Sequence, residues 1–567
     1  MRNNTIGRLT QAAGQWCRGR LPERRHFRRD LVAGLPGAIS SVPDGMACGL
    51  LAGVNPVNGL YASFAGRTFG SLPTGTKLMV VATTSAAALA AGSGLAGVPE
   101  PDRARALGLL TLLAGVIMLV AAALKLGRYT RFVSHSVMTG FLTGVSLNIV
   151  FGQLPDLVGA KASGSVAATK ALDLVTHPGR IDLSSLLTGV ITLAVLIGLM
   201  RTRFALIGSL AALVASTMVV IGFGLDSVRR VSDVGTIPRG IPLPGIPDLT
   251  LLTPSLLASA AAVAVIVLVQ GAGVAEVAPN PDGSRSMPNQ DFAGQGVGNI
   301  ASALFGGQPV GGSVGQTAVN VTAGAKSRWG GVLSGLWMVL ILIAFSGLVG
   351  KVPMPTLAAI LIFAAIGSIR LGTITTILRS GSTSVIALVT TLVATLALPV
   401  SAAVGIGVAL SLLLQLNQEA MDLRLVRLIP EAEHDFREVR APKHLRDGDI
   451  VILDVYGSLF YAGSRTLQVM LPDPDGAEAP EVILRLRGRT TLGATFFAVL
   501  LDYADRLERT GGRLYLTGLS KDLAEYWNEE RLQGLGLSVH TFNATALLGE
   551  STRQALQDAQ THQIVRE

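Results

Sequence analysis

The chain has 567 residues, of which 49% are apolar and 15% are charged, and its mean hydropathy is +0.51. Soluble domains are roughly one quarter charged, so this composition argues against a soluble enzyme. The 66 glycines show no three-residue period, which excludes collagen, and two cysteines cannot form a disulfide framework or a multi-cysteine metal site. The net charge of +9 suits a membrane protein with basic cytoplasmic segments better than a nucleic-acid-binding protein.

Polarity changes along the chain and predicts four parts. Residues 1–30 contain eight arginines and no secretory signal pattern. They predict a basic cytoplasmic segment that lies on anionic lipid, with an organellar transit peptide as the alternative. Residues 31–417 predict a transmembrane domain, 418–440 a linker and 441–567 a polar cytoplasmic domain. With both termini in the cytoplasm, the number of membrane spans is even.

Several apolar windows have the length of a membrane-spanning helix, which needs about 20 residues to cross about 30 Å of hydrocarbon. Basic pairs such as Arg128/Arg131 and Arg201/Arg203 lie at the edges of these windows, as expected at a membrane surface. The windows are 106–126, 131–153, 183–200, 204–224, 255–275, 329–350, 356–369, 383–399 and 401–417.

Other apolar blocks are short or interrupted by glycine, proline and hydroxyl residues, namely 35–54, 73–91, 291–307 and 306–325. Lipid cannot satisfy bare backbone groups, so broken helices at membrane depth must line protein or a wet cavity. The blocks 73–91 and 306–325 fall in different halves of the chain, which predicts a transporter binding site between inverted repeats. No phosphate-binding loop and no zinc-binding HExxH motif is present, so neither an enzyme nor a cofactor is predicted.

Four ordered motifs resemble the SulP (sulfate permease) family of anion transporters. They are DLVAGLPGAISSVPDGMACGLLAGVNPVNGLYAS (30–63), RFVSHSVMTGFLTGVSLNIVFGQL (131–154), the block from NQDFAGQGVG to TAGAKSR (289–328) and VPMPTLAAILIFAAIG (352–367). Residues 450–463, 481–488 and 494–519 alternate strand and helix patterns, which predicts a small α/β fold. This part resembles a STAS domain, the usual cytoplasmic appendage of that family.

The resemblance implies an α-helical polytopic membrane protein with fourteen segments arranged as two inverted repeats of seven. It implies uracil-permease-like core and gate domains, followed by the cytoplasmic α/β STAS domain. The anion then sits between the facing N-termini of the third and tenth segments, which are half-helices. A helix N-terminus offers unpaired N–H groups and about half a positive charge. This agrees with the lack of lysine and arginine in 78–91 and 306–325.

The same resemblance assigns the candidate substrate-binding residues to the starts of the two half-helices. They are Ala82, Thr83, Thr84 and Ser85 for the third segment, and Gly312, Ser313, Val314, Gly315, Gln316 and Thr317 for the tenth. The alternatives are hydroxyls that bond their own helix carbonyls and small residues that serve helix packing. Some family members carry Ser-Arg where this chain has Gly315-Gln316, so a fixed positive charge is missing there.

Asp44 and Gln270 complete the candidates. A carboxylate inside a span is costly and usually functional, so Asp44 is the expected proton-coupling residue. The alternative is a structural carboxylate bonded to nearby N–H or hydroxyl groups. Gln270 falls where many relatives carry an acid on the eighth span, which suggests that the coupling acid has moved to Asp44 or Glu276. Gln270 then faces the site as a neutral donor or bridges helices.

The expected function is secondary active transport of a small inorganic anion, with sulfate as first candidate and bicarbonate as second. Coupling to H⁺ is favoured over coupling to Na⁺, since the sequence shows one acidic residue that could bind a proton and no recognisable set of Na⁺ ligands. The transport cycle is expected to be elevator-like, in a homodimer in the cytoplasmic or inner membrane. The alternatives are an anion sensor that signals through its STAS domain, and a dicarboxylate or nucleobase carrier on the same fold. No metal and no nucleic acid are expected as partners.

Overall fold

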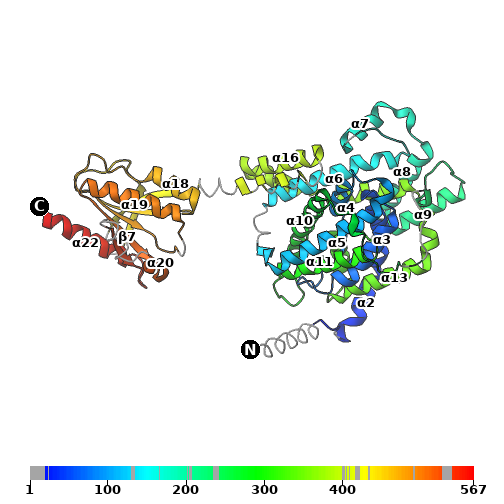
Figure 1. Cartoon of the computed structure of the whole chain (residues 1–567), viewed down its shortest axis with the longest axis horizontal. Helices are drawn as coiled ribbons and strands as arrows, with labels where there is room; N and C mark the ends of the chain where they lie inside the picture. Colours follow the sequence, from blue (N-terminus) through cyan, green and yellow to red (C-terminus); the bar gives the residue numbers. More distant parts are fainter. Residues whose placement is uncertain are drawn as a thin grey trace. The chain divides into compact units, whose positions relative to one another are not determined.

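The computed structural model describes two compact units, Met1–Ser411 and Leu412–Glu567. Figure 1 shows the first as a body of helices and the second as a sheet with helices around it. The described residues are 20–22, 24–128, 134–164, 166–200, 202, 207–233, 240, 242–398, 402–403, 405–407, 409–410, 412–414, 422–431, 435–489, 492–526 and 539–566.

The first half of the helical unit begins with a long helix and contains one short strand. Its elements are α2 (Arg24–Leu51), α3 (Pro56–Ala65), the π-turn η1 (Gly66–Gly70), β1 (Val81–Thr83), α4 (Ser85–Gly94), η2 (Glu100–Asp102), α5 (Arg103–Ala123), α6 (His135–Leu157), α7 (Ala167–Thr176), η4 (Pro178–Arg180), α8 (Leu183–Met200), α9 (Gly208–Gly222), η6 (Val231–Asp233) and η7 (Leu249–Leu251). The helices match the predicted windows within a few residues.

The second half repeats the order of the first: two helices, a short strand that leads into a short helix, and then further apolar helices. Its elements are α10 (Pro254–Val277), α11 (Pro288–Leu304), β2 (Val310–Gly312), α12 (Val314–Thr322), α13 (Trp329–Val349), α14 (Met354–Ser368), α15 (Leu371–Ser380) and α16 (Ser382–Ala397). This recurrence agrees with the predicted repeat.

Membrane-spanning potential is distributed over both halves. Among the described residues, five helical segments are long and apolar enough to cross a membrane: Glu100–Ala123, His135–Leu157, Leu183–Met200, Pro254–Val274 and Met354–Ser380. Shorter apolar helices accompany them, and large apolar side chains are exposed on the outer surface, for example Met218 and Ile343. Such a surface is stable in lipid and would aggregate in water.

The expectation that 35–54 and 291–307 are interrupted was wrong, because both lie mainly in continuous helices, α2 and α11. Their glycines serve close packing. A side chain on Gly59 of α3 would collide with the carbonyl of Gly45 in α2, and one on Gly296 of α11 would lie 2.9 Å from the carbonyl oxygen of Gly115 in α5. Small residues let helix backbones approach in this way in membranes.

The second unit is a six-stranded sheet in the order β4-β3-β5-β6-β7-β8. Strands β5 to β8 are parallel, and β3 pairs antiparallel with both β4 and β5. Apolar side chains of α18 and α19 form one core, and those of α22 pack in another with alternate strand residues. The bounds are β3 (Arg424–Glu431), β4 (Asp435–Arg440), β5 (Ile450–Tyr456), α18 (Tyr461–Met470), β6 (Glu481–Arg485), α19 (Ala494–Arg509), β7 (Arg513–Leu519), α20 (Lys521–Tyr526), β8 (Val539–Asn543) and α22 (Glu550–Arg566).

This sheet corrects the predicted linker 418–440, because β3 and β4 lie within it. The arginines of the segment suggested solvent-exposed chain. In β3, however, Leu425 and Leu428 are buried while Arg424 is exposed. One face of an antiparallel strand can carry charges when the other face packs on the core. The described residues 424–431 and 435–440 therefore belong to the α/β unit.

Phe496 of α19 gives a test of that unit's independent core. Its side chain is fully buried, whereas that of Phe460 is 55% exposed. We expect Phe496→Ala to reduce the free energy of unfolding of an isolated fragment 422–567 by about 3–5 kcal/mol. Phe460→Ala is the matched control and should change it far less. Urea unfolding followed by circular dichroism measures both, and equal effects would contradict the core assigned here.

Candidate functional site

A pair of short strands lies at the start of the two half-helices. β1 and β2 pair antiparallel, with Val81 opposite Gly312 and Thr83 opposite Val310. α4 and α12 follow directly, so they begin at opposite ends of the strand pair. Thr84 and Ser313 are the N-caps, and each hydroxyl accepts a bond of 3.3 Å from the N–H three residues later. Both segments are thus broken helices, as the sequence predicted.

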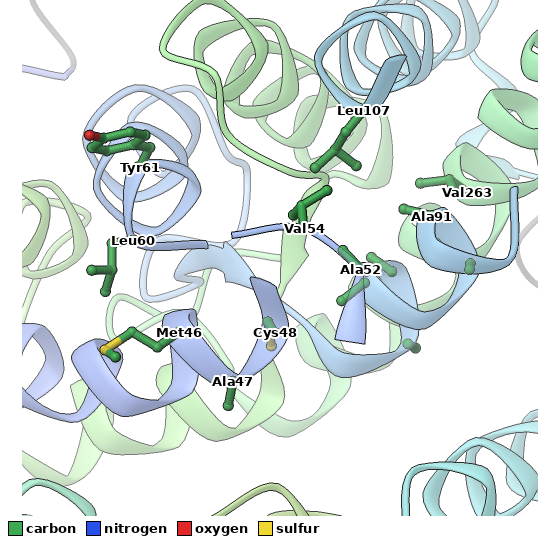
Figure 2. Packing of buried hydrophobic residues seen from close by; sticks show 14 of the residues in the cluster. Met46, Ala47, Cys48, Ala52, Val54, Leu60, Tyr61, Ala91, Leu107 and Val263 are labelled. Atoms are coloured by element: carbon green, nitrogen blue, oxygen red, sulfur yellow. The ribbon is translucent and has the colours of Figure 1, made fainter. Parts of the chain in front are cut away.

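Apolar packing holds α4 in place behind the strand pair. Figure 2 shows Ala91 of α4 beside Val263 of α10, with Leu107 of α5 nearby. Met46 and Cys48 of α2 belong to the same buried cluster. α4 therefore belongs to a buried apolar cluster that it shares with α2, α5 and α10.

Amide side chains of α11 form hydrogen bonds with backbone N–H and carbonyl groups of β2. The Asn299 amide accepts from Val310 N at 3.0 Å and donates to Val310 O at 2.7 Å, and Gln295 Oε1 accepts from Gly312 N at 3.0 Å. Both side chains are fully buried. Sequence reasoning missed these residues. Their signal is a polar stripe with a spacing of four, Asp291, Gln295 and Asn299, on a glycine-rich helix.

Asn299→Ala tests this support. It leaves the N–H and the carbonyl of Val310 without their partner, at a cost of about 1–3 kcal/mol for each buried group. We expect a clear fall in the unfolding temperature of the purified protein, measured by intrinsic fluorescence. Asn58→Ala is the matched control, since Asn58 bonds the carbonyl of Gly306 from an exposed position. A fall as large in the control would contradict the structural role of Asn299.

A buried polar cluster joins α12 to α2 and η1. Gln316 donates from Nε2 to Asp44 Oδ2 at 3.1 Å, and its Oε1 accepts from Arg67 Nη2 at 2.6 Å. Arg67 is 1% exposed; it also donates to Ser334 Oγ at 2.7 Å and to the Ser41 hydroxyl. The cluster therefore places a carboxylate and a guanidinium on opposite ends of one amide.

Arg67 adds a positive charge beside the α12 start that the sequence analysis did not anticipate. No lysine or arginine lies in 78–91 or 306–325, but Arg67 reaches the start of α12 from another segment. Its signal in the sequence is a single arginine in the apolar run 56–70, since a charge buried in a span needs partners. Two of the three residues that accept its hydrogen bonds, Ser334 and Gln316, are far away in the sequence.

The predicted site residues have different surroundings. The hydroxyls of Thr83 and Ser63 are hydrogen-bonded at 3.3 Å, and Thr317 Oγ1 accepts from Val80 N at 3.0 Å. The hydroxyls of Thr83 and Thr317 therefore take part in hydrogen bonds within the protein. Ala82 and Gly312 are buried in the strand pair. Gly271 of α10 packs against Gly312, and the Oε1 of neighbouring Gln270 is buried with no hydrogen-bond partner among the described residues.

Other predicted residues are open to their surroundings. Ser85 and Val314 are half-buried, Gly315 is exposed, and a side chain at Gly315 would meet open space. Asp44 is also part-exposed, although Gly45 to Gly49 beside it are buried. The structure brings Asp44, Ser313 and Gln316 together, next to the exposed Gly315. The side chain of Glu276 lies outside the described residues.

A bundle of apolar helices in which two broken helices start at a buried strand pair is typical of a membrane transport protein. The model of the Sulfate permease family matches residues 27–414, and the chain belongs to this family of anion transporters. The family consists of transporters rather than enzymes.

Two relatives and one solved structure illustrate the likeness. The chain is 29% identical over 506 residues to the putative sulfate transporter YvdB of Bacillus subtilis, covering 88% of this chain and 93% of YvdB. It is 25% identical over 520 residues to the bicarbonate transporter BicA of Synechocystis sp., covering 87% and 89%. The structure of SLC26A9 matches with a TM-score of 0.83 at 18% identity, covering 99% of this chain and 95% of that one. The predicted polytopic fold with a C-terminal STAS domain is confirmed.

Proposed function

We propose that this protein is a secondary active transporter of a small inorganic anion, with sulfate as the first substrate and bicarbonate as the second, coupled to H⁺. The substrate site is proposed at the starts of α4 and α12. The observation that carries the proposal is the cluster of Asp44, Gln316 and Arg67 beside the α12 N-terminus. The names of YvdB and BicA support these two anions.

The anion is proposed to lie against the groups that remain accessible at the two helix starts. Backbone N–H groups at the N-termini of α4 and α12 favour negative charge. The hydroxyl of Ser85 and the open side of Gly315 offer room for it. Thr84 and Ser313 accept bonds from their own helices, which leaves their hydroxyl hydrogens able to donate to an oxyanion.

Coupling follows from the charges of the cluster. When Asp44 is ionised, its charge and that of Arg67 cancel across Gln316. Proton binding at Asp44 leaves the Arg67 charge uncompensated, which strengthens the attraction for an anion. By linkage, a bound anion favours protonation of Asp44 to the same degree. Proton and anion therefore bind together, which is the requirement for symport.

The proposed motion is elevator-like, in a homodimer in the cytoplasmic membrane with both termini in the cytoplasm. Helices α2, α3, α5, α10, α11 and α13 pack mainly with one another, and α6, α8, α9, α14 and α16 form a second such group. These groups support a core domain that carries the anion and a gate domain. The transmembrane domain is proposed to span residues 31–417. The proposed STAS domain, 441–567, is extended toward the N-terminus to include β3 and β4.

Uptake by proteoliposomes tests the function. Labelled sulfate and bicarbonate should accumulate under an inward acid gradient and less under an inward Na⁺ gradient at uniform pH. Binding without accumulation would favour the anion sensor. Competition by a dicarboxylate or by uracil, with no effect of sulfate, would replace the proposed substrate class.

A further inference from the structure

A second basic site lies away from the transport cluster, at the end of the bundle where α2 and α13 begin. A cavity of about 360 Å³ opens between four segments. The start of α2 and the residues before it contribute Arg20, Arg25 and His26, and the start of α13 and the turn before it contribute Lys326, Ser327, Arg328 and Trp329. Lys77 and Asp282 line it from two further loops.

The charge of this cavity is strongly positive. Among the residues that the structure describes, Asp282 is the one acid that lines the cavity, and its carboxylate is bonded to the Lys77 ammonium. Burial and then the charge of Arg20 lower the pKa of Arg328 to about 10. Arg328 is held in place by bonds from Nη1 to the carbonyls of Leu72 and Thr74, at 2.8 and 3.1 Å. An anion in the cavity would relieve the repulsion between the two guanidinium groups.

Hydrogen bonds, some of them to backbone groups, connect the segments that line the cavity. Asp30 of α2 is buried and accepts from Lys326 N at 2.7 Å and from Ser327 Oγ at 2.5 Å. The indole of Trp329 donates to Arg20 O at 2.9 Å. These bonds hold the basic segments close to one another, so the convergence of charge is built into the fold.

The residues around the cavity are of the kinds that are common in the headgroup region of a bilayer. Trp329 is the first residue of apolar α13, and tryptophan is enriched at membrane–water interfaces. On α2, the exposed apolar side chain of Phe27 lies among the basic residues 24–29, and that of Val32 follows them. The cationic groups thus lie where the polar surface meets the apolar surface.

We propose that this cavity binds a phosphate-bearing anion, and that the phosphodiester headgroup of an anionic phospholipid is its principal source, with free phosphate as the other source of the same chemistry. Basic clusters beside a membrane-spanning helix recognise anionic headgroups. The inference does not depend on the substrate or on the coupling ion proposed above.

Binding to the purified full chain in a neutral detergent tests the site. The probes are dioctanoyl phosphatidylglycerol, dioctanoyl phosphatidylcholine and inorganic phosphate, each titrated while bound ligand is counted by native mass spectrometry. We expect saturable binding of phosphatidylglycerol and none of phosphatidylcholine. The variant Arg25→Gln/Lys326→Gln should bind phosphatidylglycerol about thirty-fold more weakly, because each basic group near such a surface contributes a factor of about five. Saturable binding of phosphate that displaces the lipid would identify free phosphate as an alternative source.

The matched control is Arg28→Gln/Arg29→Gln, which removes two exposed charges from the same helix outside the cavity. It should retain wild-type affinity. Equal weakening in both variants, or equal binding of phosphatidylcholine, would overturn the proposal. If the double variant does not purify as a folded protein, Lys326→Gln alone serves, since its ammonium has no ion pair among the described residues, and a loss of about five-fold is expected.

Discussion

Replacing Arg67 with methionine should reduce the initial rate of sulfate uptake by about 30- to 100-fold. A unit charge about 6 Å from an anion contributes roughly 2–3 kcal/mol at an effective dielectric constant of about 20. Methionine fills a similar volume but leaves Asp44 without a compensating charge. The unfolding temperature should fall as well, because the oxygens of Ser41, Gln316 and Ser334 lose their donor.

Arg67→Lys separates charge from geometry. Lysine keeps the charge but cannot reproduce the fork of hydrogen bonds, so we expect uptake between that of the wild type and that of Arg67→Met. The control is Arg180→Met, because Arg180 is half-exposed and pairs with Asp173 at 3.1 Å. Initial rates of labelled sulfate uptake into proteoliposomes, normalised to inserted protein, measure all three. Wild-type rates in Arg67→Met would remove Arg67 from the anion site.

Much of the fold could be predicted from local sequence. Apolar windows of sufficient length predicted the spanning helices, and the resemblance to the family at 82–85 and 312–317 predicted the two helix starts. Thr84 and Ser313 are N-caps because their side chains can bond the first turn, which is a property of a few adjacent residues. Interruptions were harder to judge, since Pro43 lies inside a continuous helix.

The polar cluster could not be predicted in the same way. Arg67 and Gln316 are 249 positions apart, and Gln316 and Asp44 are 272 apart. A single sequence gives the cost of burying each group but not the partner that offsets it. The contact of Arg67 in η1 with Gln316 at the α12 start is such a case, since the charge is present in the fold but absent from the local motif.

Replacing Asp44 with asparagine should abolish proton-driven accumulation while leaving anion binding. In the wild type, apparent anion affinity should decrease as the pH rises, because ionised Asp44 cancels the charge of Arg67. In Asp44→Asn that charge is never cancelled, so affinity should be high and independent of pH. Sulfate binding measured across a range of pH, together with uptake under an inward acid gradient, gives both quantities.

The double variant Asp44→Asn/Arg67→Met distinguishes coupling from folding. It removes both charges of the cluster, so it should unfold at a higher temperature than Arg67→Met alone, in which one buried charge is unpaired. Its anion affinity should be low and independent of pH. Asp226→Asn, at a 94% exposed position, controls for loss of a carboxylate elsewhere and should behave as the wild type. Gradient-driven accumulation that persists in Asp44→Asn would assign the proton to another group, because no carboxyl would remain at position 44 to bind it.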